Sequence, residues 1–496
     1  MSNLGLEVTL DWALYVPLIG GLVAALIAWV RQAGAVPGKR APVLRLLALV
    51  IACITVLLEA GMLSIVPEGQ STTLLGLTFA MSVPARYVLT AANVALLCAL
   101  IYGWLTVDED DEQGNGDPWR VIAVCATSTL LAGAVLSTDR LVTALLLFAS
   151  ALPIAASVFV LTSNIARSSP DSAFVGDEQQ AEFAAGERHA AGRLAGAFKQ
   201  LALALLATVL WIAGVTLLDR YGFNLENTRL LQFGVALLAV GMLVRAGSMP
   251  FSAPWADTLE TTPSASMLLL GAIAPVALVA GMLMLAPIEG NLARDAAAGW
   301  LGAAGALLAG LRAIGTLRTP RGNEPEEDKS GKIAVIKAMT VALAVSWAAY
   351  GVLSGSQMGA VGAVLIATNI ALAMPLLVVG GRWTARIGAA SLLGLPPFGG
   401  FSGTMLIAGS AANAGGLWLA LLLLGSALVA GAWLSTVFKP ERGKSDGPPT
   451  RRKLTSDPLM LVAVVLIVAQ LALFLLSNSR LTPLLDWAAL PWLTAP

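Results

Sequence analysis

Long apolar runs recur along the whole chain, and they constrain its fold more than any other feature. Hydrophobic residues make up 57% of the 496 residues and charged residues only 12%, which is more apolar surface than a water-soluble core can bury. Runs of about 18–25 residues are long enough to cross a bilayer as helices, so the sequence predicts an all-α polytopic membrane protein with about fourteen transmembrane helices. The expected spans are 12–31, 43–65, 84–105, 119–137, 141–163, 194–218, 229–248, 263–287, 296–316, 333–353, 357–380, 386–410, 414–438 and 457–478.

Charge and side-chain chemistry exclude several classes of function. The formal net charge is zero, so we expect no nucleic-acid partner. Cys53, Cys98 and Cys125 lie in apolar runs without metal-ligand spacing, and we interpret them as packing residues. The single histidine, His189, falls in a polar segment, which argues against a haem or His-ligated metal. Without an Fe–S cysteine cluster or a nucleotide-binding glycine motif either, we expect no cofactor and no catalytic chemistry in this chain.

Lysine and arginine are distributed unevenly between the loops, and this predicts the orientation. Loops after odd-numbered spans carry most of them, including six between Lys439 and Lys453, whereas loops after even-numbered spans carry few. Since positively charged loops stay in the cytoplasm, we expect an inner-membrane protein with both termini on the non-cytoplasmic side. The longer polar loops are expected at 106–118, 164–192 and 439–456.

The segment from Arg245 to Pro263, RAGSMPFSAPWADTLETTP, interrupts this apolar pattern. Pro250 and Pro254 each remove a backbone donor and break the helix, and carbonyls freed in a membrane must find partners within the protein. Arg245 next to such a break is a candidate for an ion pathway, together with the acids Asp257 and Glu260. We expect Arg245 to pair with an acid or with freed carbonyls, and Asp257 alternatively to cap the helix that resumes before Pro263. A simple polar loop between two spans is the alternative.

A second interruption, Ser391–Thr404, falls five spans later and contains Pro396 and Pro397. Paired interruptions at corresponding positions indicate an inverted repeat with a site near the membrane midplane. We therefore predict two five-helix units, broken in the seventh and twelfth spans. The expected division is an N-terminal three-helix segment (1–118), two repeats (119–287 and 288–438), and a basic loop with the last helix (439–496).

A few charges fall within other spans. Glu59 lies in the second span, and Lys332 and Lys337 open the tenth. The two lysines can extend to the headgroups, whereas Glu59 must be protonated or paired. All three are candidates for an ion pathway.

The two interrupted spans resemble those of the antiporter-like membrane subunits of respiratory complex I, Mrp cation/proton antiporters and membrane-bound hydrogenases. The family motif at the seventh span is matched by Arg245, Pro250, Trp255, Asp257 and Pro263. The motif at the twelfth span is matched by Gly394, Pro396, Pro397, Gly400 and Phe401. The resemblance covers about residues 10–480, and it implies fourteen spans, termini outside the cytoplasm and assembly with other membrane and peripheral subunits.

The resemblance also implies a line of charged residues that passes protons through the membrane, and this chain lacks most of it. The fifth-span glutamate falls near Ala149–Ala151, and the seventh-span lysine becomes Arg245, which does not readily give up a proton. Neutral residues also occupy the remaining positions: Leu269 and Pro275–Val276 in the eighth span, Asn369–Ala373 in the eleventh and Thr404 in the twelfth. Hydroxyls and amides such as those of Asn369 and Thr404 form hydrogen bonds but do not titrate near neutrality.

Four functions stay open on the sequence alone. The chain could couple or scaffold ion movement in a redox-driven complex, belong to a proton-driven inorganic-carbon uptake module with a soluble zinc protein, form part of a cation/proton antiporter, or be a structural subunit that seals a complex against leakage. The missing charges favour the structural or modified coupling roles.

Overall fold

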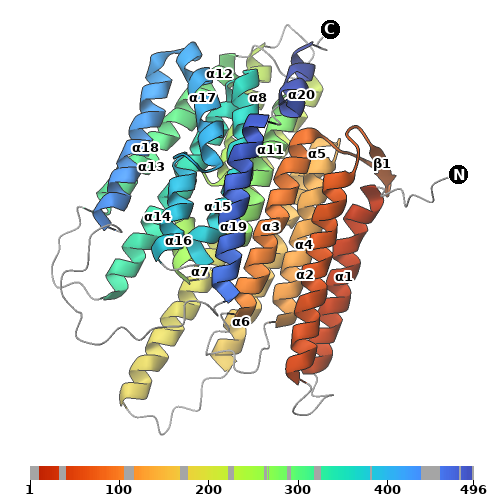
Figure 1. The fold of residues 1–496 in the computed structure, drawn as a ribbon, viewed down its shortest axis with the longest axis vertical. Coiled ribbons are helices and arrows are strands. Elements are labelled where there is room, and N and C mark those ends of the chain that lie inside the picture. Colours follow the sequence, from red (N-terminus) through yellow and green to blue (C-terminus); the bar gives the residue numbers. More distant parts are fainter. Residues whose placement is uncertain are drawn as a thin grey trace, which may run out of the picture.

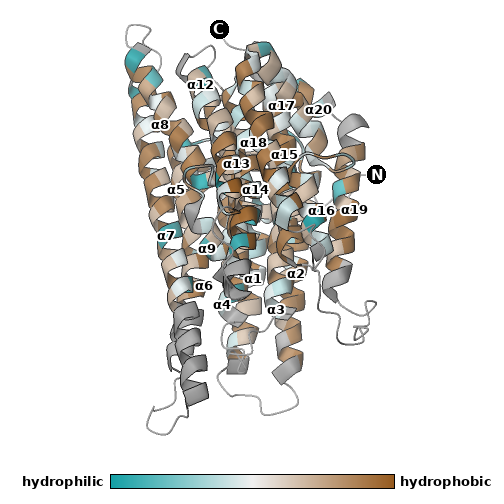
Figure 2. Ribbon diagram, turned by 90° about the vertical axis from the view of Figure 1, so that its left-hand side faces the viewer, coloured by the Kyte–Doolittle hydropathy of each residue, from teal (hydrophilic) through white to brown (hydrophobic). Residues whose placement is uncertain are grey.

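The computed structural model describes residues 10–32, 41–105, 117–167, 177–221, 228–261, 265, 267–286, 292–317, 326–379, 382–436, 458–479 and 482–493. Long helices stand side by side through this part of the molecule (Figure 1), and hydrophobic residues occupy much of their length (Figure 2). Twelve helical segments among these residues are long and apolar enough to cross a membrane. The prediction of an all-α polytopic membrane protein is therefore confirmed.

Three long helices and a small hairpin form the N-terminal part. The helices are α1 (Leu10–Gln32), α2 (Ala41–Ile65) and α3 (Val83–Leu105), and strands β1 (Ser71–Leu74) and β2 (Leu77–Ala80) pair antiparallel between α2 and α3. Leu75 and Gly76 make the turn with φ of 51° and 80°. The sequence analysis did not predict this hairpin, because its strands are only four residues long and a Leu-Gly turn is a weak hairpin signal.

The next helices are α4 (Asp117–Leu136), α5 (Arg140–Ala149), α6 (Ala151–Arg167), α7 (Asp177–Tyr221) and α8 (Thr228–Ala246). The predicted polar loop 164–192 is wrong over its second half, because α7 begins at Asp177. That segment is rich in Ala, Glu and Gln, which favour helix. At 45 residues and about 1.5 Å per residue, α7 is roughly 68 Å long, more than twice the hydrocarbon thickness.

The second half of the chain contains several interrupted helices. Its elements are α9 (Ala253–Thr261), η5 (Met267–Ile273), α11 (Ala274–Leu285), α12 (Leu292–Ala297), η6 (Ala298–Ala303), α13 (Ala304–Gly315), α14 (Glu326–Leu353), α15 (Gln357–Val379), α16 (Arg382–Leu392), α17 (Gly400–Ala414), α18 (Gly416–Thr436), α19 (Pro458–Ser479) and α20 (Thr482–Leu493). The predicted span 386–410 is divided between α16 and α17, and the apolar part of α19, Val462–Leu475, is shorter than the twelve segments that are long enough to cross a membrane. Fourteen spans and an inverted repeat thus stay predictions.

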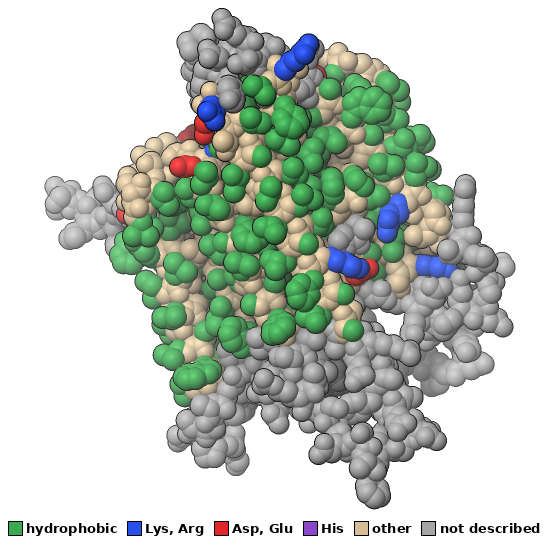
Figure 3. Space-filling model, turned by 180° about the vertical axis from the view of Figure 1, so that it is seen from behind, with side chains coloured by type: hydrophobic (Ala, Val, Ile, Leu, Met, Phe, Trp, Pro, Cys, Tyr) green, Lys and Arg blue, Asp and Glu red, His purple; other side chains and the backbone are tan. Residues whose placement is uncertain are grey.

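The interior and the periphery of the bundle differ sharply in burial. In the most apolar 18-residue stretch of the η5–α11 segment, and also in that of α15, 94% of the residues are buried, whereas the values for the corresponding stretches of α2 and α18 are 33% and 28%. Hydrophobic side chains cover much of the face seen in Figure 3. Such a surface suits lipid rather than water as its solvent. The start of α1 and the end of α20 lie toward the same end of the bundle (Figure 1).

Candidate functional site

Arg245 lies at the end of α8 and is only 6% exposed. One guanidinium nitrogen, Nη2, donates to the backbone oxygen of Leu147 at 2.8 Å and to Ser150 Oγ at 3.0 Å. Its Nε has no hydrogen-bond partner among the described residues. Of the two expected partners, an acid or a carbonyl, the structure shows a carbonyl. That carbonyl belongs to another helix, α5, and not to the break beside Arg245.

The acceptors of Arg245 lie where the predicted fifth span, 141–163, is interrupted. Ser150 separates α5 from α6, and its hydroxyl donates to the Leu147 oxygen at 2.7 Å. Pro153 follows in the first turn of α6 and has no N–H with which to continue the helical hydrogen bonds. This interruption was not predicted, although Pro153 is a sequence signal for it.

The turn after α8 is fixed by close packing. Gly247 has φ of +74°, and its N–H and that of Ser248 both donate to the Leu243 oxygen, at 2.8 and 3.0 Å. A Cβ at Gly247 would lie 1.6 Å from the Trp255 ring, so only glycine fits this position. Ser248 Oγ lies 2.9 Å from Ser346 Oγ of α14. The turn thus packs against Trp255 of α9 and contacts Ser346 of α14.

The structure separates Asp257 from Arg245. Asp257 lies inside α9, so the alternative role as a helix cap is wrong. Its carboxylate accepts from Lys199 Nζ of α7 at 2.7 Å, and the side chains are 46% and 55% exposed. Glu260 lies in the last turn of α9, and its side chain falls outside the described part of the chain. Pro250 lies in the turn after α8, and Pro254 lies in the first turn of α9, where a proline is tolerated.

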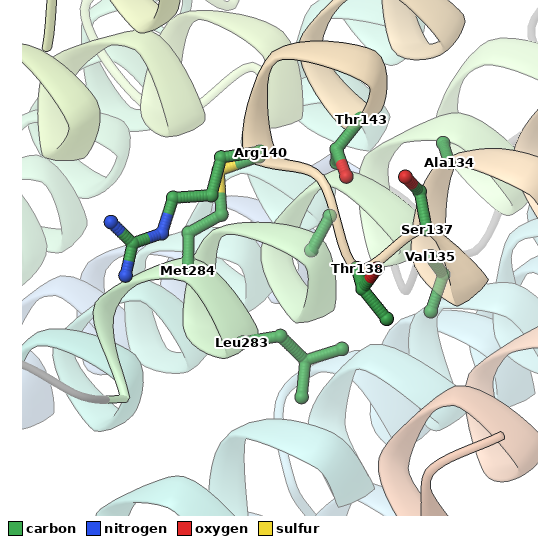
Figure 4. Close-up of a pocket in the computed structure, with 9 residues that line it drawn as sticks. Ala134, Val135, Ser137, Thr138, Arg140, Thr143, Leu283 and Met284 are labelled. Carbon is green, nitrogen blue, oxygen red and sulfur yellow. The ribbon is translucent and has the colours of Figure 1, made fainter. Parts of the chain in front are cut away.

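Cavities flank the Arg245 contact on both sides along α5 and α6. The larger one, called here the vestibule, has a volume of about 250 Å³ and is lined by Ser137, Thr138, Arg140 and Thr143 with residues of α11 (Figure 4). Arg140 points away from the Ser137 and Thr143 hydroxyls in this view, and it pairs with Asp219 at 3.4 Å. The other cavity, of about 20 Å³, is lined by Ala151, Gln200 and Thr258 among others. This is room for about one water molecule.

Along α5 and α6, the two residues that accept from Arg245 lie between the residues that line the two cavities. Thr143, at the vestibule, is one turn before Leu147, or about 6 Å along α5, and Ala151, at the small cavity, directly follows Ser150. The guanidinium holds the segment that separates them.

The second interruption is neutral throughout. Helix α16 ends at Leu392 and α17 begins at Gly400, with the partly or fully exposed Pro396 and Pro397 between them. Asn369 of α15 accepts from Ser391 Oγ at 2.7 Å and donates to the Ser391 oxygen at 3.1 Å. Ser391 Oγ also lies 2.8 Å from Gln470 Oε1 of α19. Ser391 begins the predicted interruption, but its contact with Gln470 was not predicted, although a lone glutamine in the apolar run of α19 was a usable signal.

The remaining candidates are dispersed. Thr404 donates to its own helix, to the oxygens of Gly400 and Phe401 at 3.1 and 2.8 Å. Lys332 and Lys337 are partly exposed in α14. Glu59 is fully buried in α2 beside Ser128. The structure therefore brings none of these four together with Arg245 in one site.

Arg294 is a buried cation that the sequence analysis did not select. It is 2% exposed in α12 and donates to the oxygens of Leu285 and Val352 at 3.1 and 2.9 Å. These carbonyls lie at the C-terminal ends of α11 and α14, so Arg294 donates hydrogen bonds to the ends of both helices. Among the described residues, no group of three or more His, Cys, Asp and Glu side chains is placed to hold a metal ion.

Comparison with known proteins shows which solved structures have a similar fold. No protein-family model and no curated protein sequence matches the chain. Solved structures do match it over its whole length. A chain of respiratory complex I from Thermus thermophilus has a TM-score of 0.66 at 16% identity, with 98% of this chain and 99% of that chain covered. A chain of the membrane-bound sulfane sulfur reductase, an archaeal respiratory membrane complex, gives 0.64 at 16% identity, with 97% and 96% covered.

A chain of the Mrp complex from Dietzia sp. DQ12-45-1b gives a TM-score of 0.64 at 14% identity, with 99% of each chain covered. All three solved chains belong to membrane complexes with several subunits. The fold resemblance predicted from the two interrupted spans is confirmed. This chain shares, over nearly its whole length, the fold of these chains of respiratory and Mrp complexes.

Proposed function

We propose that this protein is an antiporter-like membrane subunit of a larger ion-coupled, energy-converting complex, in which it scaffolds and seals rather than relays protons. The whole-length fold supports the first part, because the matched chains belong to respiratory and Mrp complexes. Its partners are other membrane and peripheral subunits of that complex, and its exposed apolar surface faces lipid. Its termini lie on the non-cytoplasmic side of the inner membrane.

The observation that carries the sealing role is the surroundings of Arg245. Its described hydrogen bonds go to a backbone oxygen and a serine hydroxyl, neither of which can accept or release a proton near neutral pH. Arginine keeps its charge. A fixed cation between the vestibule and the small cavity repels protons and metal cations, as arginines do in selective pores. This makes the first half of the chain a barrier to cations.

The second half offers no substitute for the missing charges at its interruption. Asn369 and Ser391 exchange two neutral hydrogen bonds, and Ser391 Oγ also lies 2.8 Å from Gln470 Oε1, so neutral polar groups join α15, α16 and α19. Such a network fixes the packing of helices but provides no group that titrates. It supports the scaffolding part of the proposal, and a division into two inverted five-helix units accommodates both interruptions.

Isolation of the complex from native membranes tests the proposed assembly. We expect affinity purification of the tagged chain in a mild detergent to yield a defined species much larger than 51.0 kDa, with further polytopic subunits identified by mass spectrometry. Recovery of the chain alone, after chemical cross-linking before solubilisation, would contradict the proposal. A soluble zinc protein as the main partner would instead support the carbon-uptake alternative.

A further inference from the structure

A second buried polar group lies outside the Arg245 site, among the N-terminal helices. It consists of Glu59 of α2, Asn93 of α3 and Ser128 of α4, whose exposed fractions are 0%, 4% and 2%. Ser128 Oγ is in hydrogen-bond contact with Glu59 Oε2 and lies 2.8 Å from Asn93 Oδ1. The other polar atoms of the group, Glu59 Oε1 and Asn93 Nδ2, have no hydrogen-bond partner among the described residues.

Counting hydrogens shows that this group is one proton short. A serine hydroxyl has one hydrogen, a carboxylate has none, and the Asn93 oxygen can only accept. Ser128 therefore cannot donate to both neighbours at once. If Glu59 carries a proton, it donates to Ser128 Oγ, which in turn donates to Asn93 Oδ1, and each contact has a donor.

Exchanging the positions of Asn93 Oδ1 and Nδ2 would also supply a donor, because Nδ2 would then donate to Ser128 Oγ. In that arrangement Glu59 would stay ionised. A buried carboxylate needs a cation or several donors, and this one would have the single hydroxyl of Ser128 and an orphaned second oxygen. Arg245 makes its described hydrogen bonds to Leu147 and Ser150. A neutral Glu59 therefore fits the surroundings better than a charged one.

The ionisable groups on the helices packed around α2 do not change this conclusion. Cys125 of α4 interacts electrostatically with Glu59 and is no cation. Arg86 of α3 donates to the Val66 oxygen, and Arg120 of α4 donates to the Gly103 oxygen, both near helix ends. Asp11 of α1 accepts from Thr72 of the hairpin.

We propose that Glu59, Ser128 and Asn93 form a proton-binding site in which Glu59 is a neutral carboxylic acid that donates its hydrogen to Ser128. The ligand is a single proton, held between α2, α3 and α4. This inference does not depend on the proposed function, because the protonation of Glu59 is measurable whether or not the chain seals or conducts.

Infrared spectroscopy of the full chain in lipid at neutral pH tests the site. In the difference spectrum between the parent and Glu59→Gln, we expect the loss of one carboxylic-acid C=O band, which moves to lower frequency in D₂O. Asp257→Asn is the matched control. Its carboxylate pairs with Lys199 at 2.7 Å, so we expect it to remove carboxylate bands only.

Ser128→Ala provides a second test that keeps Glu59 in place. Because it removes the acceptor of the Glu59 hydrogen, we expect the acid band to shift to higher frequency. Loss of only carboxylate bands in Glu59→Gln would overturn the proposal, and so would an acid band that is unchanged in Ser128→Ala. The protein with the second substitution retains the carboxyl group, so a failure of Glu59→Gln to fold leaves the site testable.

Discussion

At the scale of single residues, the unusual feature is a buried arginine whose described acceptors are uncharged. A buried charge replaced by an apolar residue of similar volume is often neutral or stabilising, whereas removal of its partner is costly. We therefore expect Arg245→Met to melt at or above the temperature of the parent protein. Ser150→Ala leaves the guanidinium with only the Leu147 oxygen, and we expect a loss of about 1–3 kcal/mol.

The double variant distinguishes this explanation from simple packing effects. With Arg245 already replaced by methionine, Ser150→Ala should cost much less than it does in the parent, because no buried cation remains unsatisfied. Thermal unfolding in detergent of the parent, both single variants and the double variant measures the coupling. Additive losses would show that Ser150 does not stabilise Arg245.

The sequence predicted Arg245 but not its partners. An arginine beside two prolines is easily recognised in an apolar sequence. Its partners Leu147 and Ser150 are not, because they lie 98 and 95 residues away. A backbone oxygen has no sequence signature at all. Asp257 and Glu260 are nearer in sequence, but α9 carries Asp257 to the partly exposed Lys199.

At the scale of secondary-structure elements, the turn after α8 depends on Gly247. Alanine there combines a φ of +74° with a Cβ 1.6 Å from the Trp255 ring. Gly76→Ala is a matched control, because Gly76 has φ of +80° and no atom within 4 Å of its Cβ position. We expect Gly76→Ala to cost about 1 kcal/mol and Gly247→Ala to lower the melting temperature much further. Equal losses would contradict the packing of Trp255 on this turn.

The second interruption depends in the same way on Gly400. A Cβ there would lie 2.1 Å from the Ser391 oxygen and 2.7 Å from Asn369 Nδ2. Gly400→Ala should separate α16 from α15, with a loss of about 1–3 kcal/mol. Gly409→Ala on the same helix is the control, since the nearest atom would be 3.9 Å away, and we expect no loss. A harmless Gly400→Ala in the same melting experiment would show that the neutral network is not tightly packed.

The elements were predicted unevenly, for physical reasons. The length of the apolar runs identified nearly all of the membrane helices, because the thickness of the bilayer requires an apolar stretch of about that length. The start of α7 was missed because a polar helix beyond the bilayer has no hydrophobic pattern to reveal it. The β1–β2 hairpin was missed because strands of four residues pair through backbone groups, which the sequence does not display.

At the scale of the whole molecule, the fold and the site carry different information. The fold matches chains of respiratory and Mrp complexes at only 14–16% identity, so these matches describe the fold and not the side chains of its interior. The two interrupted spans predicted that fold. They could not predict that Arg245 reaches Leu147 and Ser150, because that depends on how α8, α7, α5 and α6 pack in three dimensions.

Arg245 is proposed to block cations by electrostatic repulsion, and Coulomb's law gives the magnitude of that repulsion. At about 5 Å and an effective dielectric constant of about 20, a unit charge repels a proton by roughly 3 kcal/mol, which is about two orders of magnitude in rate. Arg245→Met keeps the volume and removes this repulsion. Lys199→Met is the control, because it removes a cation that is 55% exposed.

The most direct measurement is passive proton entry into liposomes that contain the purified complex, followed with an internal pH-sensitive dye after a pH step. We predict slow entry with the parent protein and with Lys199→Met, and entry at least tenfold faster with Arg245→Met. Unchanged leakage in Arg245→Met, or a loss of coupled proton pumping without leakage, would contradict the assignment of Arg245 as a seal.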